Sequence, residues 1–416
     1  MNQKLFSKDF ILVVIGQIIS LFGNAALRFA MPLYLLNETG SSAVFGTVTA
    51  CAIIPAILLS PVGGIVADRV NKRNVMVILD FFTAALILAF CVLMGGVNLV
   101  VLLTVTLMIL YGIAGAYQPS VQASIPVLVG SDHMMEANSI VNMISSFSAL
   151  LGPVLGGIVY SAYGLKPVLL VCIACFVISA VMEIFIHIPF EKQASEGSVW
   201  QTARSDFGQS IRFICKDMPV IGKAVLAVCG INLFLSSMIN VGLPYLVTEV
   251  IDLDAAQANQ LYGFAEGILA AGGLAGGVCA GVFAKKLSVR KAGMLIVTAA
   301  VCQFPIAVSL AVFSSGMVTY VILTAGCFVV MTCCTVYTIL MMTFYQTVTP
   351  PHLLGKVVAV IITVAMCAQP LGNAMYGVLF ELCKGFEYAV VLFAGVVSLG
   401  IAVVLRNIFK GVLSSL

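Results

Sequence analysis

The sequence predicts an all-α integral membrane protein, with twelve transmembrane helices arranged as two pseudo-symmetric six-helix bundles. The first observation is composition: of the 416 residues, 61% are hydrophobic and only 9% are charged, whereas a soluble domain carries about 25% charged residues. So few charges cannot solvate the surface of a soluble protein, and lipid must therefore be the solvent for most of the chain. At roughly 35 residues for each helix and its connection, the length accommodates about twelve spans.

The second observation is a series of apolar runs, each long enough for the roughly 20 residues of a spanning helix. These runs lie at 10–36, 43–67, 74–96, 99–125, 139–162, 167–189, 219–247, 259–284, 292–313, 317–347, 357–382 and 387–409. The first run is too long for the apolar core of a signal peptide, and we expect it to be the first span. The ninth and tenth runs are separated by a short Ser-Gly connection at 313–317.

The third observation is an internal repeat with an offset of 217 residues. Gly64-x-x-x-Asp68-Arg69-x-x-x-Arg73 ends the second run, and Gly281-x-x-x-Lys285-Lys286-x-x-x-Arg290 ends the eighth. Pro153 and Pro370, in the fifth and eleventh runs, have the same offset. Duplicated six-helix halves are a transporter architecture, in which the solute site lies near the membrane midplane between the halves.

The basic residues predict the orientation of the spans. When the N-terminus is placed in the cytoplasm, seventeen of the 20 Lys and Arg residues fall on the inner side, as cytoplasmic loops require. Only Lys166 and Lys384 fall outside, and Arg28 lies within a span. The pattern predicts a multi-pass protein of the cell (cytoplasmic) membrane with both termini in the cytoplasm.

Three regions follow from this reading: an N-terminal bundle at 1–189, a linker at 190–218 and a C-terminal bundle at 219–416. Apolar residues recur in the linker at helical spacing beside Arg204, Arg212 and Lys216. They are Trp200, Ala203, Phe207, Ile211 and Ile214. This pattern is typical of a basic amphipathic helix at the inner lipid interface; a solvated tether is the alternative.

The segment from Gly64 to Arg73 resembles the signature loop between the second and third helices of the major facilitator superfamily. The resemblance assigns a role in conformational switching to Gly64, Asp68, Arg69, Lys72 and Arg73. Asn71 stands where the superfamily often has Gly, and Asn also tolerates a left-handed turn. The alternative is that the basic cluster only anchors the loop on the inner side.

A second resemblance lies in the fifth run, where Ser148-x-x-x-Gly152-Pro153-x-x-Gly156-Gly157 is similar to the fifth-helix motif of superfamily exporters. Ser148 replaces an initial Gly. Gly and Pro permit a kink and close helix contact, so a general packing interface is the alternative. Gln369-Pro370-Leu371-Gly372-Asn373 in the eleventh run is a partial copy.

Together with the linker and the turn at 349–357, these motifs make the chain similar to bacterial exporters of the macrolide-efflux and enterobactin-exporter type. The resemblance implies a monomeric antiporter that works by alternating access, with protons as the coupling ion and amphipathic, drug-like molecules as substrates. We expect neither cofactor nor nucleic acid as a partner. One departure is that the fourth run lacks the Arg that proton-coupled drug antiporters often carry there.

Polar residues at helical spacing indicate which helix faces border a central cavity. The candidates are Gln17, Asn24 and Arg28 in the first run, Asn232, Ser236 and Asn240 in the seventh, and Glu266 in the eighth. Arg28 and Glu266 lie at similar predicted depth with opposite charge, and we expect them to be electrostatically coupled. A carboxylate at membrane depth usually marks function, so Glu266 is the candidate for proton coupling. Local pairing of each residue is the alternative.

Two further acidic residues lie nearer the inner face. Asp80 is assigned to support of the signature loop, with a role in the cavity as the alternative. Glu183 is one turn from His187, and both could reach the lipid headgroups. The thirteen cysteines show no disulfide framework or metal spacing, so we expect no metal site.

Other functions remain as alternatives. The substrate could be a lipid or lysolipid, or a siderophore-like metabolite. A non-transporting receptor or a channel is a further possibility, but the sparse polar residues argue against a continuous pore. No paired His-carboxylate cluster or Ser/His dyad occurs at membrane depth, which argues against an enzyme.

Overall fold

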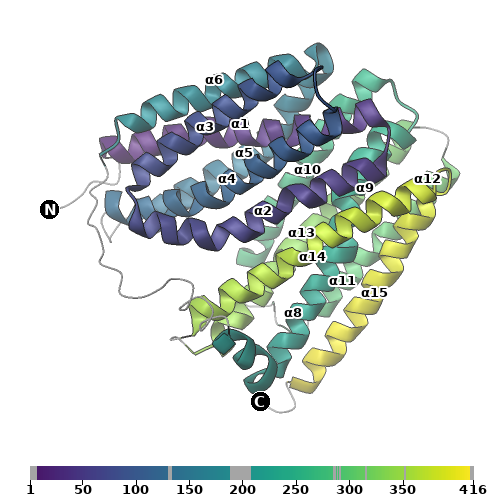
Figure 1. Ribbon diagram of the computed structural model, residues 1–416. Helices are drawn as coiled ribbons and strands as arrows, with labels where there is room; N and C mark the ends of the chain where they lie inside the picture. The colour runs from purple at the N-terminus through teal and green to yellow at the C-terminus, as the bar shows by residue number, and fades with distance from the viewer. Residues whose placement is uncertain are drawn as a thin grey trace. The chain divides into compact units, whose positions relative to one another are not determined.

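The computed structural model describes residues 7–129, 134–187, 208–283, 287, 289, 292–313, 316–350 and 353–412, and within helices it leaves the side chains of 60–69 and a few others undescribed. The helices of the first half are α1 (Lys8–Thr39), α2 (Ser42–Arg69), α3 (Lys72–Leu93), α4 (Leu99–Leu128), α5 (Met134–Tyr163) and α6 (Leu165–Ile184). Those that follow are η2 (Phe213–Asp217), α8 (Pro219–Ile231), η3 (Asn232–Ser236), α9 (Ser237–Tyr245), η4 (Leu246–Val250), α10 (Ala255–Val282), α11 (Ala292–Val301), α12 (Gln303–Val312), α13 (Gly316–Val348), α14 (Leu354–Leu382) and α15 (Glu387–Val412) (Figure 1).

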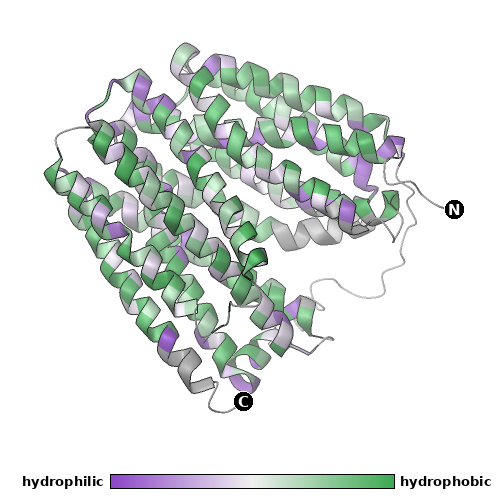
Figure 2. Ribbon diagram, turned by 180° about the vertical axis from the view of Figure 1, so that it is seen from behind, coloured by the Kyte–Doolittle hydropathy of each residue, from purple (hydrophilic) through white to green (hydrophobic). Residues whose placement is uncertain are grey.

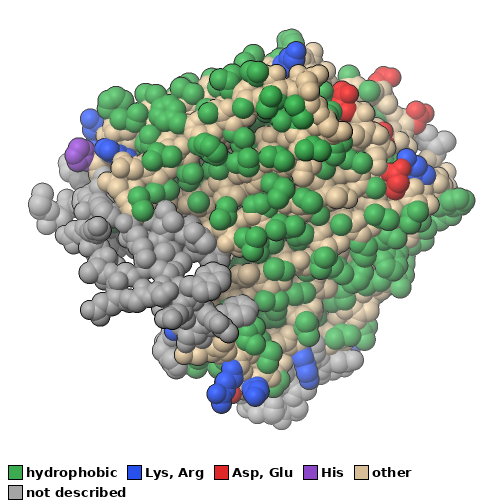
Figure 3. Space-filling view, viewed as in Figure 1, with side chains coloured by type: hydrophobic (Ala, Val, Ile, Leu, Met, Phe, Trp, Pro, Cys, Tyr) green, Lys and Arg blue, Asp and Glu red, His purple; other side chains and the backbone are tan. Residues whose placement is uncertain are grey.

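Twelve helical segments of the described chain are long and apolar enough to cross a membrane, which confirms the predicted all-α membrane fold. Their surfaces fit a lipid solvent. Large apolar side chains such as Leu58, Val92 and Leu382 are 66%, 76% and 77% exposed. Hydrophobic residues run along the helices, and hydrophilic residues gather at helix ends and connections (Figure 2). One face in space-filling view is likewise covered by hydrophobic side chains, with charged ones near its edges (Figure 3).

The chain forms two compact units. Unit 1 contains Met1–Gly40, Val48–Ala194 and Asp254–Gly267, and unit 2 contains Ser41–Thr47, Ser195–Leu253 and Ile268–Leu416. Two short segments therefore belong to the unit of the other sequence half: the start of α2 belongs to unit 2, and the first part of α10 belongs to unit 1.

Each unit is built by lengthwise packing of its own helices. In unit 1, α1 packs against α5 and α6, and α3 packs against α6 and α4. In unit 2, α11 packs against α15 and α13, while α14 packs against the segment from α8 to α9. Four helices of unit 1, α1, α3, α4 and α6, are therefore neighbours, with α4 also packed against α1.

Two spans deviate from a regular α-helix. The ninth span is interrupted at Cys302, between α11 and α12. Pro305 has no N–H to bond the carbonyl one turn earlier, which accounts for an interruption just before it. The seventh span contains the π-helical turns η3 and η4, a feature that is frequent at functional sites. The break between the ninth and tenth spans is present, because α12 ends at Val312 and α13 begins at Gly316.

The predicted amphipathic linker lies largely outside the described residues, including Trp200, Ala203 and Phe207. At its described end, Phe213 and Ile214 are buried, whereas Arg212 and Lys216 are exposed. Ile211 is partly buried, and the amphipathic linker as a whole stays a prediction.

Candidate functional site

The signature loop connects α2 to α3, with α2 ending at Arg69 and α3 beginning at Lys72. Asn71 caps α3, because its Oδ1 accepts a hydrogen bond of 3.1 Å from the backbone N of Arg73. The Arg73 guanidinium reaches the carbonyl of Ile184 at 3.5 Å, at the end of α6, where a cation is favoured by the helix dipole. The side chains of Gly64, Asp68 and Arg69 are outside the described set, so the switching role stays a prediction.

The fifth-helix motif lies at a close contact of α5 with α1. A Cβ at Gly152 would collide with Ala25, and one at Gly156 would lie 3.4 Å from Phe29. Small residues let helix backbones approach in this way. Ser148 is buried. The motif thus forms a packing interface within unit 1, and its association with export stays a prediction.

The same helix contacts the first part of α10 in unit 1. A Cβ at Gly157 would lie 3.0 Å from Gly263 Cα, and one at Gly263 would lie 2.7 Å from the carbonyl of Pro153. Near the helix ends, Asn37 of the neighbouring α1 donates from Nδ2 to Asn259 Oδ1 at 2.9 Å. Ser161 Oγ donates to the carbonyl of Ala256 at 2.6 Å. We call these interactions the α5–α10 contact.

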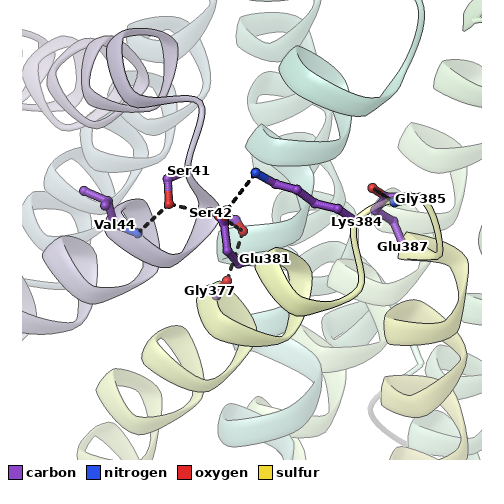
Figure 4. A network of polar contacts seen from close by, with 8 residues as sticks. All are labelled: Ser41, Ser42, Val44, Gly377, Glu381, Lys384, Gly385 and Glu387. Atoms are coloured by element: carbon purple, nitrogen blue, oxygen red, sulfur yellow. Dashed lines mark hydrogen bonds and ion pairs between the residues drawn. The ribbon is translucent and has the colours of Figure 1, made fainter.

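Unit 2 contains a comparable contact between the start of α2 and the end of α14. A Cβ at Gly46 would lie 2.8 Å from Gly377 Cα. Ser42 Oγ donates to the carbonyl of Gly377 at 2.9 Å, and Ser41 Oγ donates to Glu381 Oε2 at 2.9 Å. Glu381 also pairs with Lys384 at 2.7 Å. Figure 4 shows this network, which we call the α2–α14 contact.

Neither contact was expected from the sequence. The offset of 217 residues relates Pro153 to Pro370, so it could have suggested that α14 repeats the packing of α5. Nothing in the hydropathy pattern, however, indicates which helix would lie against Gly157 or Gly377.

The candidate charges Arg28 and Glu266 both belong to unit 1 and are partly exposed. The Arg28 guanidinium lies over the ring of Tyr111, with 4.0 Å between Cζ and the ring centroid. Tyr262 donates from its hydroxyl to Glu266 Oε1 at 3.1 Å. Its ring stacks on Phe29, with 4.8 Å between the centroids. We call these five residues the ionic-aromatic cluster.

The described residues show no ion pair between Arg28 and Glu266. Instead, each charge contacts a different tyrosine: Tyr111 lies under the guanidinium, and Tyr262 donates to the carboxylate. The Nε atom of Arg28 is buried without a hydrogen-bond partner. The sequence indicated the two charges but not the tyrosines that contact them.

The predicted polar stripe on α1 divides into two parts. Gln17 is fully buried and donates from Nε2 to the Tyr117 hydroxyl at 2.9 Å, so it lies in the interior of unit 1. Asn24 and Arg28 are partly exposed. A role in lining the cavity remains a prediction for these two.

The stripe on the seventh span has a similar mixture of positions. Asn232 Nδ2 donates to the carbonyl of Ala365 on α14 at 2.8 Å, and Ser236 lies 3.5 Å from Asn232 Oδ1. Asn240 is exposed. Asn232 thus holds the π-helical turn η3 against α14, a structural role that the spacing of polar residues did not reveal.

Asp80 and Glu183 are buried inside unit 1. Asp80 accepts a hydrogen bond from Ser20 at Oδ1, at 3.1 Å, and lies beside Ser179 of α6. The expectation that Glu183 reaches the headgroups is wrong, because Glu183 is fully buried, accepting from Tyr117 at 2.7 Å, whereas His187 is exposed. Hydrogen-bonding partners inside the bundle explain why this carboxylate turns inward.

No cluster of three or more His, Cys, Asp or Glu side chains suited to a metal occurs in the part of the chain that is described. The thirteen cysteines are free thiols. The chemistry of the site is therefore that of ionic, aromatic and hydrogen-bonding side chains.

Comparison with known proteins finds transporters among the relatives of this chain. The chain is 23% identical over 371 residues to macrolide efflux protein A of Streptococcus pyogenes, covering 86% of this chain and 85% of that protein. It is 24% identical over 374 residues to the multidrug efflux pump Tap of Mycolicibacterium fortuitum, covering 86% of each. A shorter match, 32% identical over 161 residues and 38% of each chain, is to the lysophospholipid transporter LplT of Cronobacter sakazakii.

The fold is also that of solved transporters. The crystal structure of the nucleoside transporter NupG superposes with a TM-score of 0.77 at 14% identity, covering 97% of this chain and 100% of that one. The family model of the Major Facilitator Superfamily matches residues 13–373. The chain is thus a multi-pass membrane transporter and not an enzyme, and it belongs to the major facilitator superfamily, with efflux transporters among its relatives.

Proposed function

We propose that this protein is a secondary active exporter that moves amphipathic, drug-like molecules out of the cell by alternating access, in exchange for protons. The observation that carries the proposal is the ionic-aromatic cluster. There a guanidinium and a carboxylate lie close to aromatic rings without forming an ion pair. Macrolide efflux protein A and the pump Tap, whose names state related activities, support the direction of transport.

The cluster has the chemistry that an amphipathic molecule requires. Phe29 and Tyr262 are buried and stack on each other, so they support the carboxylate. The ring of Tyr111 is partly exposed and can contact the apolar part of a substrate. Arg28 and Glu266 offer charges of both signs to its polar part. Because a charge that is not neutralised is costly in a membrane, a proton on Glu266 is stabilised there, as is a substrate group whose charge is opposite to that of Arg28 or Glu266. This makes Glu266 a candidate both for proton binding and for recognition of cationic substrates.

The setting of the transporter is part of the proposal. The distribution of basic residues favours cytoplasmic termini, and bacterial relatives favour the bacterial cell membrane. We propose that the protein works as a monomer with Gln17, Asn24, Arg28, Asn232, Ser236, Asn240 and Glu266 contributing to the solute cavity or its supports.

Transport in proteoliposomes tests this function. A panel containing a macrolide and a lipophilic cationic dye is loaded, and export is measured with and without an imposed pH gradient. We expect gradient-driven export that Glu266→Gln and Arg28→Ala both weaken, with non-additive effects in the double variant. Glu38→Gln is the matched control, because Glu38 lies on α1 and is exposed. Equal movement of the whole panel with and without the gradient would contradict proton coupling.

A second candidate substrate is a lysophospholipid, which the match to LplT favours over 161 residues. A guanidinium can bind a phosphate group through paired hydrogen bonds, and Arg28 would supply it. The same vesicles, loaded with a fluorescent lysophospholipid, distinguish the two substrates. If the lysophospholipid competes with the dye, and Arg28→Ala abolishes export of both, the result would favour the lysophospholipid as the substrate.

A further inference from the structure

A buried polar network lies inside unit 1, on α1, α3, α4 and α6. Ser20 donates to Asp80 at 3.1 Å, Tyr117 donates to Glu183 at 2.7 Å, and Gln17 donates to Tyr117 at 2.9 Å. Ser20 also lies beside Tyr117, and the two carboxylates interact electrostatically. All five side chains are at most 5% exposed. The network therefore joins two acidic residues that are more than one hundred positions apart in the sequence.

The hydrogen-bonding capacity of this network is incomplete. Asp80 Oδ2, Glu183 Oε2 and Gln17 Oε1 are buried acceptors that receive no hydrogen bond. Ser179 on α6 lies beside Asp80, but its hydroxyl donates to the carbonyl of Gly16 at 3.1 Å. A buried acceptor that receives no hydrogen bond destabilises the fold, and more so when it is charged. The network thus has acceptors in excess and needs another hydrogen-bond donor.

No cation of the described chain neutralises the two carboxylates. Tyr117 is the titratable group that contacts them. The charged groups at the nearby helix ends have other partners: Asp9 accepts from the backbone N of His187, and Arg73 reaches the carbonyl of Ile184. Farther along α1, Arg28 lies over Tyr111. Two like charges are thus left together away from water, an arrangement whose cost a single proton reduces.

Apolar side chains close one end of the network. Val13, Met76, Val121 and Ile186 are fully buried. They lie one turn from Gln17, Asp80, Tyr117 and Glu183 respectively, toward the end of unit 1 where α1 begins and α6 finishes. In the other direction along α1, Ser20, Asn24 and Arg28 follow at spacings of three to four residues. Their face extends about 16 Å from Gln17 to Arg28, at 1.5 Å per residue.

We propose that Asp80 and Glu183 together bind one proton inside unit 1, and that the polar face of α1 connects this site to the ionic-aromatic cluster. The proton resides on one carboxylate and donates a hydrogen bond to the other or to Gln17 Oε1, and the net charge of the pair changes from minus two to minus one. The role of this pair in transport coupling rests on the proposed function, in which it is a second proton-binding site in addition to Glu266. Proton binding itself does not require transport.

Infrared spectroscopy of the purified protein in lipid nanodiscs tests this site without any substrate. At neutral pH, we expect the carbonyl band of a protonated carboxyl group in the wild type. Asp80→Asn and Glu183→Gln should each shift or remove this band, and the double variant should lack it. Glu38→Gln, an exposed carboxylate on α1, and Glu266→Gln should retain it.

Tyr117→Phe provides a variant that keeps both carboxylates and the aromatic ring. It should move the frequency of the band, because Glu183 loses its hydrogen-bond donor. A band that is unchanged in the double variant would overturn the proposal, as would a band that disappears when Na⁺ replaces K⁺ at constant pH, since that indicates a sodium site. If the protein exports substrate in response to a pH gradient but shows no such band, only the inference about Asp80 and Glu183 is overturned. If the band is present but no export is measured, only the proposed function is overturned.

Discussion

The α5–α10 contact in unit 1 and the α2–α14 contact in unit 2 use the same packing but different polar chemistry. In each, a glycine of one helix lies against a glycine of the other: Gly157 against Gly263, and Gly46 against Gly377. The first is completed by neutral groups, Asn37 with Asn259 and Ser161 with a carbonyl. The second is completed by a carboxylate and its lysine partner.

Both contacts need close backbone approach, which is possible only where the facing surfaces lack side chains. Gly46 and Gly263 stand at the 217-residue offset of the repeat, whereas Ala374 stands at that offset from Gly157 and Tyr160 at that offset from Gly377. Hydrogen bonds near helix ends can be made by many residue types, so the polar groups diverge. Under the proposed alternating-access function, we expect both contacts to break and form during the cycle, with the charged one more sensitive to ionic conditions.

The largest expected effect comes from removing the close approach. Gly46→Ala places a Cβ against the carbonyl of Asn373 and 2.8 Å from Gly377 Cα, and backbone atoms cannot yield as a flexible side chain can. We expect a loss of about 1–3 kcal/mol in the stability of the α2–α14 contact, seen as a lower Tm and slower transport.

Gly157→Ala should have a smaller effect, since its Cβ would lie 3.0 Å from Gly263 Cα. Gly277→Ala, on α10, is the matched control, because a Cβ there meets nothing within 4 Å. Equal Tm values for Gly46→Ala and Gly277→Ala would show that the α2–α14 packing does not limit stability.

An intermediate effect is expected at the neutral contact. Asn37 donates both to Asn259 at 2.9 Å and to the Tyr160 hydroxyl at 3.1 Å. Asn37→Ala removes both hydrogen bonds, with an expected loss of roughly 1 kcal/mol because these groups are partly exposed. Thermal unfolding at low and high salt should give the same difference from the wild type, and a salt-dependent difference would contradict the neutral character of the contact.

The smallest effect is expected at the charged contact. Glu381→Gln keeps an acceptor for Ser41 but removes the ion pair with Lys384, in which both side chains are partly exposed. Exposed pairs contribute about 0–1 kcal/mol, and salt screens them. We expect a lower Tm at low salt that approaches the wild-type value at high salt. If Glu381→Gln and Asn37→Ala respond to salt in the same way, the proposed difference between the contacts is wrong.

Residues singled out in the sequence differ in how well their positions could be foreseen. Charges are unfavourable at membrane depth, and this singled out four ionisable residues inside the apolar runs: Arg28, Glu266, Asp80 and Glu183. The partners could not be foreseen, since Tyr111, Tyr117 and Tyr262 lie within apolar runs where an aromatic residue is ordinary. The same reasoning explains why the inward orientation of Glu183 was missed.

The sequence by itself was enough to predict the number of spans, the internal repeat and the family. Hydropathy over about 20 residues and a repeated motif are properties of contiguous sequence. Tertiary structure alone decided that Arg28 and Glu266 contact different tyrosines, that Asp80 lies near Glu183, and that Gly46 lies against Gly377. These outcomes depend on the rotation of each helix about its axis and on which helices become neighbours. Both are set by packing among residues distant in the chain, and no single span encodes them.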